Sequence, residues 1–476
     1  MLRLFLFVLP IQTIWIYREQ FVHGAKWEYG TLGFYGSEGL LWGAFLLFMI
    51  WFFKQRFQIS NFPASAGSSR LWTESVRMAD RTMRDKFQIS RDRIFVFFIL
   101  LFTLYTFLSS TWAIDADIAF QFALHVMEAF LLFFMLFLGP LSFHDAVKWF
   151  VAGALAQSML GLWQFFSQST FASTVLGISS HPAWQAGTSI VASPEIGRWL
   201  RAYGSFSHPN VFGGYMVIAL FFALIQTDAY GLRRDDASLK VSSSWWGKYV
   251  SWRMYHGGCI MYHVSFVLLT AGVFVSFSRS AWMAFVLGLL VYSFIGFREK
   301  MFSVPFTFFH FLLIPIITFI VFTTLFFPLV QTRLTGSSVN EVASISDRVS
   351  GYSEAMVLFK QHPFLGVGIG NYTASAFLLN PTQPAWAYQP VHNALLLLLV
   401  ELGVVGIVLL LFVFFTYHIS RITSQPQSPF FKWYVVCVLC SVFLTLFDHY
   451  LFSSYVGLLL GALIFGCIGR SLKEGI

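Results

Sequence analysis

Long apolar runs with almost no charge constrain the fold of this chain more than any other feature. A helix needs about 20 apolar residues to cross the roughly 30 Å hydrocarbon core of a bilayer. Only 11% of the residues are charged, whereas soluble domains reach about 25%. The sequence therefore predicts an all-α polytopic membrane protein with about 12 transmembrane helices, near residues 3–17, 37–53, 94–110, 118–138, 145–166, 209–227, 259–277, 280–297, 304–330, 392–416, 432–448 and 455–469.

Positive charge predicts the orientation of these helices. Two long polar segments, 54–93 and 227–258, are rich in Lys and Arg. If both are cytoplasmic, about 22 of the 30 Lys and Arg residues lie inside and about 8 outside, as the positive-inside bias requires. We therefore expect a multi-pass inner-membrane protein with cytoplasmic N and C termini. This topology and attraction to anionic lipids account for the net charge of +8, so no nucleic-acid partner is expected.

A single membrane domain is expected over residues 1–476, with a large extracytoplasmic loop at 331–391 between spans 9 and 10. The first run, 3–17, lacks a following small-residue cleavage pattern, so we expect a retained helix rather than a signal peptide. All four cysteines lie in apolar stretches, which predicts core packing rather than disulfides or zinc. No cofactor is expected.

Three arginines on the expected outer side stand next to helix starts. Arg198 and Arg201 precede the span that begins at Pro209, and Arg279 lies in the short turn before Ser280. One interpretation is that they reach toward lipid phosphates. As a set beside outward-facing helix N-termini, they instead predict a site for a diphosphate or a similar anion.

A third outward-facing helix N-terminus is expected at His392, which opens a very apolar run. A lone histidine near a membrane interface is often only a hydrogen-bonded structural residue. Beside an anion site, however, a neutral imidazole can accept a proton from a hydroxyl near pH 7, so His392 is a candidate general base. His208 is a second candidate, although it reads more simply as part of the helix cap before Pro209.

Two aspartates in a short outer loop, Asp115 and Asp117, have competing interpretations. They resemble an acidic pair that holds a divalent metal in some membrane glycosyltransferases. They also stand at the start of the 118–138 span, where carboxylates stabilise a helix N-terminus by about 0.3–1 kcal/mol. We favour the second interpretation, so no metal site is expected.

Ionisable residues within or at the ends of spans are further candidates. Glu128 and Glu401 lie inside spans, where such groups are functional unless they are paired. Asp448 ends the eleventh span on the outer side and could orient His392 or an arginine.

The motifs resemble those of the O-antigen ligase and O-antigen polymerase superfamily over roughly residues 195–450. Residues 1–190 match only in helix layout and hydropathy. The motifs are Arg201-x-x-Gly204-x-Phe206-x-His208-Pro209-Asn210, Phe277-Ser278-Arg279-Ser280-Ala281-Trp282, His362-Pro363-Phe364-Leu365-Gly366-Val367-Gly368-x-Gly370-Asn371-Tyr372, and His392-Asn393 followed by Glu401-Leu402-Gly403-x-x-Gly406, with Asp448 in the penultimate helix.

This resemblance implies an inverting, metal-independent glycosyltransferase with a GT-C-like membrane fold. Such enzymes move a glycan from an undecaprenyl diphosphate carrier to an acceptor hydroxyl outside the cytoplasmic membrane. It implies that Arg201 and Arg279 hold the diphosphate and that His392 activates the acceptor. Arg348 either contacts the substrate or forms an ion pair within its own loop. The supporting residues are expected to be His208, Asn210, Arg348, Asn393, Glu401 and Asp448.

The sequence does not identify the acceptor of the glycan. A ligase would use lipid A-core, a polymerase another glycan, and a protein O-oligosaccharyltransferase a protein hydroxyl; we favour the ligase. A transporter or flippase would instead spread ionisable residues along a path at the bilayer midplane. A membrane scaffold would tolerate the loss of His392.

Overall fold

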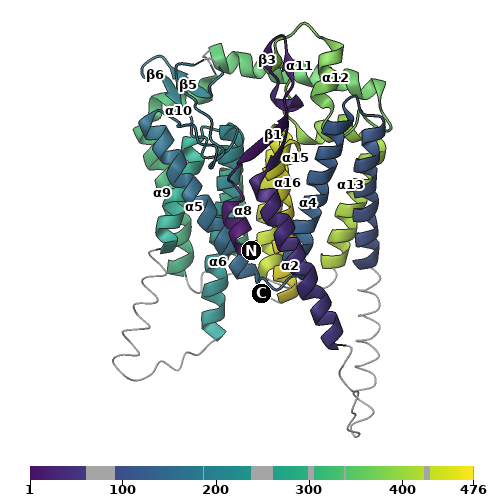
Figure 1. The fold of residues 1–476 in the computed structure, drawn as a ribbon. Coiled ribbons are helices and arrows are strands. Elements are labelled where there is room, and N and C mark those ends of the chain that lie inside the picture. Colours follow the sequence, from purple (N-terminus) through teal and green to yellow (C-terminus); the bar gives the residue numbers. More distant parts are fainter. Residues whose placement is uncertain are drawn as a thin grey trace.

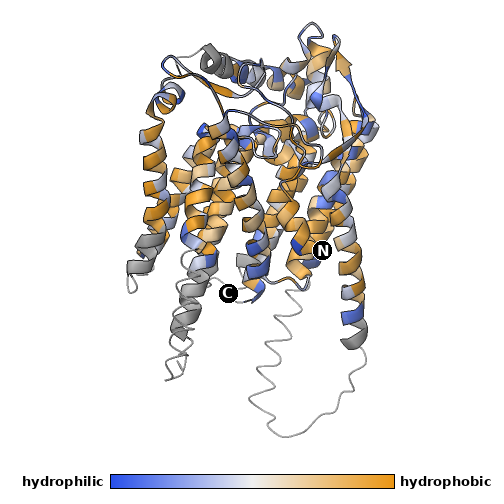
Figure 2. Cartoon of the chain, turned by 60° about the vertical axis from the view of Figure 1, so that its left-hand side comes forward, coloured by the Kyte–Doolittle hydropathy of each residue, from blue (hydrophilic) through white to orange (hydrophobic). Residues whose placement is uncertain are grey.

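The computed structural model describes residues 1–59, 92–185, 187–236, 261–298, 305–336, 339–422 and 429–474. Upright helices form most of the molecule, and strands and short helices lie across one end of them, which we call the covered end (Figure 1). Apolar residues dominate the upright helices, and polar residues are more frequent at the covered end (Figure 2). This distribution matches a protein whose helix surfaces contact lipid.

The long helices of the described residues are α2 (Gly36–Ile59), Asp92–Thr111, α4 (Ala116–Leu138), α5 (Phe143–Ser167), α6 (Pro209–Asp236), Met261–Val275, α8 (Arg279–Arg298), α9 (Pro305–Leu325), α11 (Val339–Gln361), α13 (Ala394–Ile422), α14 (Pro429–Phe447) and α16 (Tyr455–Glu474). The short helices are α1 (Leu2–Val8), α10 (Phe327–Thr335), α12 (Tyr372–Leu379), α15 (Tyr450–Ser453) and the 3-10 turns Glu28–Gly30, Ser109–Thr111 and Ala385–Ala387. The antiparallel strand pairs are β1 (Ile14–Arg18) with β4 (Leu32–Tyr35), β2 (Phe21–Val22) with β3 (Ala25–Lys26), and β5 (Ile190–Ser193) with β6 (Gly197–Leu200).

The polytopic membrane class predicted from the sequence is confirmed. Among the described residues, seven helices are long and apolar enough to cross a membrane, or up to eight if α9 and α10, which meet at a 92° bend, form one span. The apolar helix Met261–Val275 and the apolar part of α14, Val435–Phe447, are shorter than this limit. The expected total of twelve spans and the GT-C type stay predictions.

The expected first helix over 3–17 is wrong. Helix α1 ends at Val8, and the chain continues as strand β1 from Ile14. Seven helical residues span only about 10 Å, far less than a bilayer core. Pro10 cannot continue a helix, and the β-branched and aromatic residues that follow it favour a strand, which pairs with β4.

Both ends of the described chain meet the turn between α4 and α5. Arg3 forms an ion pair with Asp145 at 2.6 Å, near the start of α5. Arg470 of α16 donates to the Gly139 carbonyl at 2.7 Å, and Glu474 accepts from the Phe143 amide at 3.3 Å. The two termini therefore share one side of the bundle, away from the covered end (Figure 1). That this side is cytoplasmic stays a prediction.

The expected loop at 331–391 is mostly helical where it is described. It supplies the end of α10, then α11 and α12, which lie across the covered end (Figure 1). Apolar residues of α11, α12 and the β2–β3 hairpin share one small core, which includes Trp27, Leu358 and Tyr372. This packing holds a broad helical cover over one end of the bundle.

A break in α13 receives the glycine-rich segment that follows α11. Gly403 has a φ of 62° and a ψ of −174°, a conformation essentially restricted to glycine. Its neighbours Val404 and Val405 donate to the carbonyls of Pro363 and Phe364 at 2.9 and 3.1 Å. The two motifs around Gly366 and Gly403 are therefore one packed unit, which fixes the helix that begins just after His392.

Candidate active site

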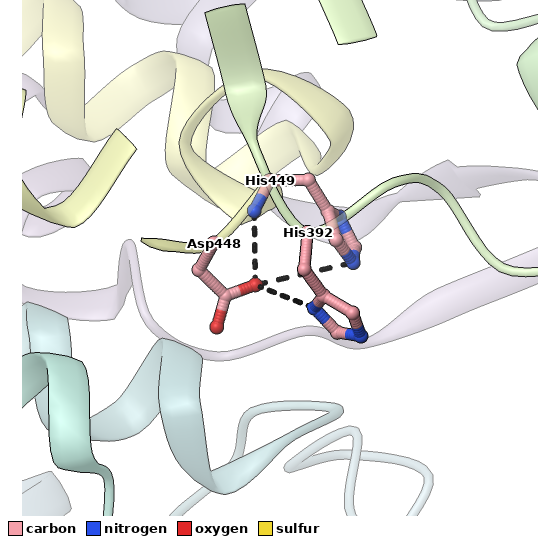
Figure 3. Close-up of side chains that lie close together, drawn as sticks. All are labelled: His392, Asp448 and His449. Atoms are coloured by element: carbon pink, nitrogen blue, oxygen red, sulfur yellow. Dashed lines mark hydrogen bonds and ion pairs between the residues drawn. The ribbon is translucent and has the colours of Figure 1, made fainter. Parts of the chain in front are cut away.

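Four side chains from separate parts of the chain form one series of polar contacts at the covered end. Nη2 of Arg201 donates to Oδ1 of Asn210 at 2.7 Å, and Nδ2 of Asn210 donates to Oδ2 of Asp448 at 2.7 Å. The other oxygen of Asp448 lies 3.6 Å from Nδ1 of His392 (Figure 3). The sequence predicted each of these residues, and the fold brings them together.

Arg201 is held by its backbone and its side chain in the segment between β6 and α6. Its amide donates to the Ser189 carbonyl at 3.2 Å, and Nε donates to the Ser276 carbonyl at 2.8 Å. The residue is only 6% exposed. These bonds fix the plane of the guanidinium and place a buried positive charge beside the first turn of α6, where Asn210 stands.

Asp448 follows the last residue of α14 and accepts hydrogen bonds on both oxygens. Oδ2 accepts from Asn210, and Oδ1 accepts from the backbone amide of His449 at 2.9 Å. Burial alone favours the neutral acid, but the interaction with His392 and the charges of nearby histidines outweigh it, so the pKa of Asp448 lies well below its usual value. A fixed carboxylate therefore faces His392.

His392 is the more open of the two histidines that flank Asp448. Its side chain is 25% exposed, and Figure 3 shows its second ring nitrogen pointing away from the carboxylate. His449 lies 5.3 Å from it, ring centre to ring centre, and its Nδ1 meets the Ser453 hydroxyl at 2.6 Å. Burial lowers the pKa of His449 to about 4. His392 thus has one open ring nitrogen, and its other nitrogen lies at an ion-pair distance from a carboxylate, longer than a normal hydrogen bond. His449 is a buried, bonded neighbour.

His208 acts as a cap in the structure. Its Nδ1 accepts from the Asn210 amide at 3.1 Å, and its Nε2 meets the Ser189 hydroxyl at 3.2 Å. Burial and the Arg201 charge lower the pKa of His208 to about 3. Both ring nitrogens are engaged, so His208 positions the start of α6 and is poorly placed to act as a base.

Arg279 is the first residue of α8 and is half-buried. The turn that leads to it is strained, since Phe277 has a φ of 47°. Arg333 of α10, only 8% exposed, donates to the Phe277 carbonyl from Nε at 3.0 Å and from Nη2 at 2.6 Å. Arg333 was not predicted as a site residue, although it is one of the few expected outer cations and follows an apolar span closely.

Arg348, on α11, lies within electrostatic reach of His449. Its Nε is buried without a hydrogen-bond partner among the described residues. Glu354, an expected partner, accepts instead from the Tyr372 hydroxyl at 3.0 Å. A substrate contact of Arg348 therefore stays a prediction.

Two expected supporting residues have structural partners instead. Asn393 caps α13, because its Oδ1 accepts from the Leu396 amide at 2.9 Å and its Nδ2 donates to the Leu446 carbonyl at 3.2 Å. Glu401 accepts from the amides of Gly370 and Tyr372 at 2.9 and 3.3 Å. Glu401 thus fastens the glycine-rich segment to α13.

Arg198 and the pair Asp115 and Asp117 also lie outside the series. Arg198 donates to the carbonyls of Ala183 and Gln185. Asp115 caps α4 and binds Arg18 at 2.8 Å, and Asp117 binds the same arginine at 2.8 Å. Burial opposes ionisation of Asp115, yet the bond from Arg18 outweighs it and lowers its pKa. The acidic pair therefore serves the helix start, the interpretation favoured from the sequence.

His392, Asp448 and His449 could also hold a metal ion, since one ligand atom from each lies within 4.8 Å of the others. Two imidazoles and one carboxylate are a ligand set that Zn²⁺ accepts. Metal independence of the reaction therefore stays a prediction.

Comparison with known families adds an independent finding. The O-antigen ligase family model matches residues 264–411 and confirms the resemblance seen in the motifs. Arg279 and His392 lie within the matched segment, and Arg201 and Asp448 lie outside it. No curated protein matches this chain.

Proposed function

We propose that this protein, which contains an O-antigen ligase family domain at residues 264–411, transfers a glycan from undecaprenyl diphosphate to an acceptor hydroxyl at the outer face of the inner membrane. The family domain and the apolar helices indicate a membrane enzyme of the ligase or polymerase type. The observation that best supports the finer proposal is the contact series Arg201–Asn210–Asp448–His392. It joins a buried cation to an oriented histidine.

In the proposed reaction, Nε2 of His392 takes the proton of the acceptor hydroxyl. The hydroxyl oxygen attacks the anomeric carbon and forms the new glycosidic bond. The bond from that carbon to the phosphate oxygen breaks, and its electron pair leaves with undecaprenyl diphosphate. A single displacement of this kind inverts the anomeric centre. Asp448 stabilises the imidazolium that forms, since its carboxylate faces the opposite nitrogen.

Arg279 and Arg201 would stabilise the charge that develops on the diphosphate. Arg279 stands at the N-terminus of α8, where free amides and the helix dipole favour an anion. Arg201 adds a guanidinium fixed by the Ser276 carbonyl and Asn210. Fixed cations can replace a metal ion in stabilising a diphosphate leaving group, which supports the proposed metal independence.

The acceptor is proposed to be lipid A-core, as in a ligase. A glycan acceptor in a polymerase, or a protein hydroxyl, would use the same residues. A deletion strain distinguishes them through its surface-glycan ladder. Loss of the whole ladder with polymer still on the carrier supports the ligase, whereas a core that bears one repeat unit identifies a polymerase.

The chemistry is tested with purified protein and a lipid-linked oligosaccharide donor. We expect His392→Ala to lower turnover by about 100-fold or more, as loss of a general base does, with unchanged yield and thermal stability. His362→Ala is the matched control, because His362 is exposed at the end of α11. Equal activity of the two variants would reject His392 as the base.

A further inference from the structure

A second group of side chains that could hold a metal ion lies between α2 and α4, apart from the candidate active site. Glu38 stands in the first turn of α2, and His125 and Glu128 lie one turn apart on α4. One ligand atom from each lies within 4.8 Å of the others. The three residues are 7%, 5% and 2% exposed. None of them contributes to the proposed glycosyl transfer.

The spacing of these atoms fits a shared metal ion better than direct bonds. Nε2 of His125 lies 3.5 Å from Oε1 of Glu38, which exceeds a normal N–H···O hydrogen bond of about 2.7–3.2 Å. Ligands about 2.0–2.1 Å from a tetrahedral Zn²⁺ are separated by roughly 3.4 Å. Nε2 of His125 is buried without a hydrogen-bond partner among the described residues. A metal ion would give this buried imidazole nitrogen a partner.

If both carboxylates are ionised, the group needs a positive partner. Glu38 accepts from the Tyr35 amide at 2.9 Å, and Glu128 accepts from the Trp42 indole at 2.6 Å, so each carboxylate has a neutral donor. Within the described parts of the chain, the ion pairs of these carboxylates include no Lys or Arg. Two carboxylates buried together repel each other and are costly unless a cation or a proton neutralises them. One divalent cation would balance both charges.

We propose that Glu38, His125 and Glu128 bind one first-row divalent cation, with Zn²⁺ as the best fit. One imidazole with two carboxylates suits Zn²⁺ and its neighbours, whereas Mg²⁺ and Ca²⁺ prefer all-oxygen sites. The ion would cross-link α2 to α4. It would also hold α16, whose Tyr455 ring packs against His125 at 4.7 Å between centres. The role is structural, so the site stands whether or not the protein is a glycosyltransferase.

The test measures metal content and stability of the full-length protein in detergent. After incubation with Zn²⁺ and removal of free ion, the wild type should retain about one equivalent by mass spectrometry, and its thermal unfolding midpoint should rise. Glu128→Gln and His125→Ala should each abolish the bound equivalent. His392→Ala should retain it, because that variant alters the other histidine cluster.

Loading with Co²⁺ tests the coordination of the site in the wild-type protein, without any variant. The wild type loaded with Co²⁺ should show the visible absorption of a four-coordinate nitrogen and oxygen site. Absence of stoichiometric Zn²⁺ and Co²⁺ in the wild type would overturn the proposal and indicate a carboxyl pair that shares a proton. Loss of the ion in His392→Ala alone would also overturn it.

Discussion

Arg333 donates two hydrogen bonds to the carbonyl of Phe277, from Nε at 3.0 Å and from Nη2 at 2.6 Å. Among the described residues, Phe277 is one of the few non-glycine residues with a positive φ, and Arg279 follows two positions later. The 92° bend between α9 and α10 brings Arg333 back onto this turn. A buried guanidinium therefore stabilises the conformation from which the proposed diphosphate contact projects.

Replacing Arg333 should impair turnover by moving Arg279. We expect Arg333→Gln to reduce kcat by about tenfold or more with a folded protein, because one amide cannot reproduce the two-pronged bond. Arg333→Lys should recover part of the rate. Steady-state assays with the lipid-linked donor measure both. Arg198→Gln is the control, at an exposed arginine whose hydrogen bonds within the described chain go to the loop carbonyls of Ala183 and Gln185. Full activity of Arg333→Gln would contradict this role.

Asn210 should support both stability and turnover, because it bonds to Arg201 and to Asp448. Asn210→Ala removes one hydrogen bond from Arg201 and the Asn210 donor from Oδ2 of the buried Asp448 carboxylate, at about 1–3 kcal/mol for a buried polar group that loses its partner. We expect a lower thermal unfolding midpoint and at least a tenfold loss of turnover. Asn380→Ala, at an exposed asparagine, should change neither. If Asn210→Ala behaved like that control, the contact series would not hold the site together.

Local sequence signals predicted which residues belong to the candidate site, but not which residues contact one another there. Charge placement and helix starts identified Arg201, Arg279 and His392 without any knowledge of which helices meet. The contact of Asn210 with Asp448 joins positions 238 residues apart, a pairing that no local pattern contains. Arg333 was missed for a related reason, since a cation after an apolar run looks like an ordinary loop residue until the chain bends back.

The main error arose where tertiary packing overrides hydropathy. The run over 3–17 is as apolar as a spanning helix, yet Pro10 and the pairing of β1 with β4 make its second half a strand. Glu401 was predicted as a supporting residue because a charge inside a span is unusual, but the sequence did not indicate what it contacts. Its partners are the backbone amides of Gly370 and Tyr372, and only the folded chain brings these within reach.

The break in α13 predicts a position that accepts only glycine. A Cβ at Gly403 would clash with the Phe364 carbonyl, and its backbone conformation is strained for any other residue. We expect Gly403→Ala to destabilise the protein by about 1–3 kcal/mol or more, seen as a lower unfolding midpoint. Gly461→Ala in α16 is the control, because a Cβ there meets nothing within 4 Å and alanine favours a helix. A midpoint equal to that of the control would mean that the break is not required.

Chelation separates the proposed reaction from the proposed metal site. If fixed arginines stabilise the leaving group, a chelator should not stop turnover by the Glu128→Gln variant, in which the site between α2 and α4 is disabled. The wild type can lose stability in the chelator without a change in mechanism. If the variant still stops turning over in chelator and recovers with added Zn²⁺, His392, Asp448 and His449 hold a metal that the reaction needs.

Acid should destabilise the covered end through His208. Its pKa is about 3 in the folded protein, lowered by burial, and about 6.5 in an unfolded chain. Between these values the unfolded state binds more protons, so the free energy of unfolding falls as the pH drops from about 6.5 toward 3. His208→Asn keeps an acceptor for the Asn210 amide but cannot titrate, so its unfolding midpoint should fall less than that of the wild type over this range. His23→Asn, at an exposed histidine of the β2–β3 turn, should follow the wild-type curve. Parallel curves for wild type and His208→Asn would show that the buried imidazole does not govern the acid sensitivity.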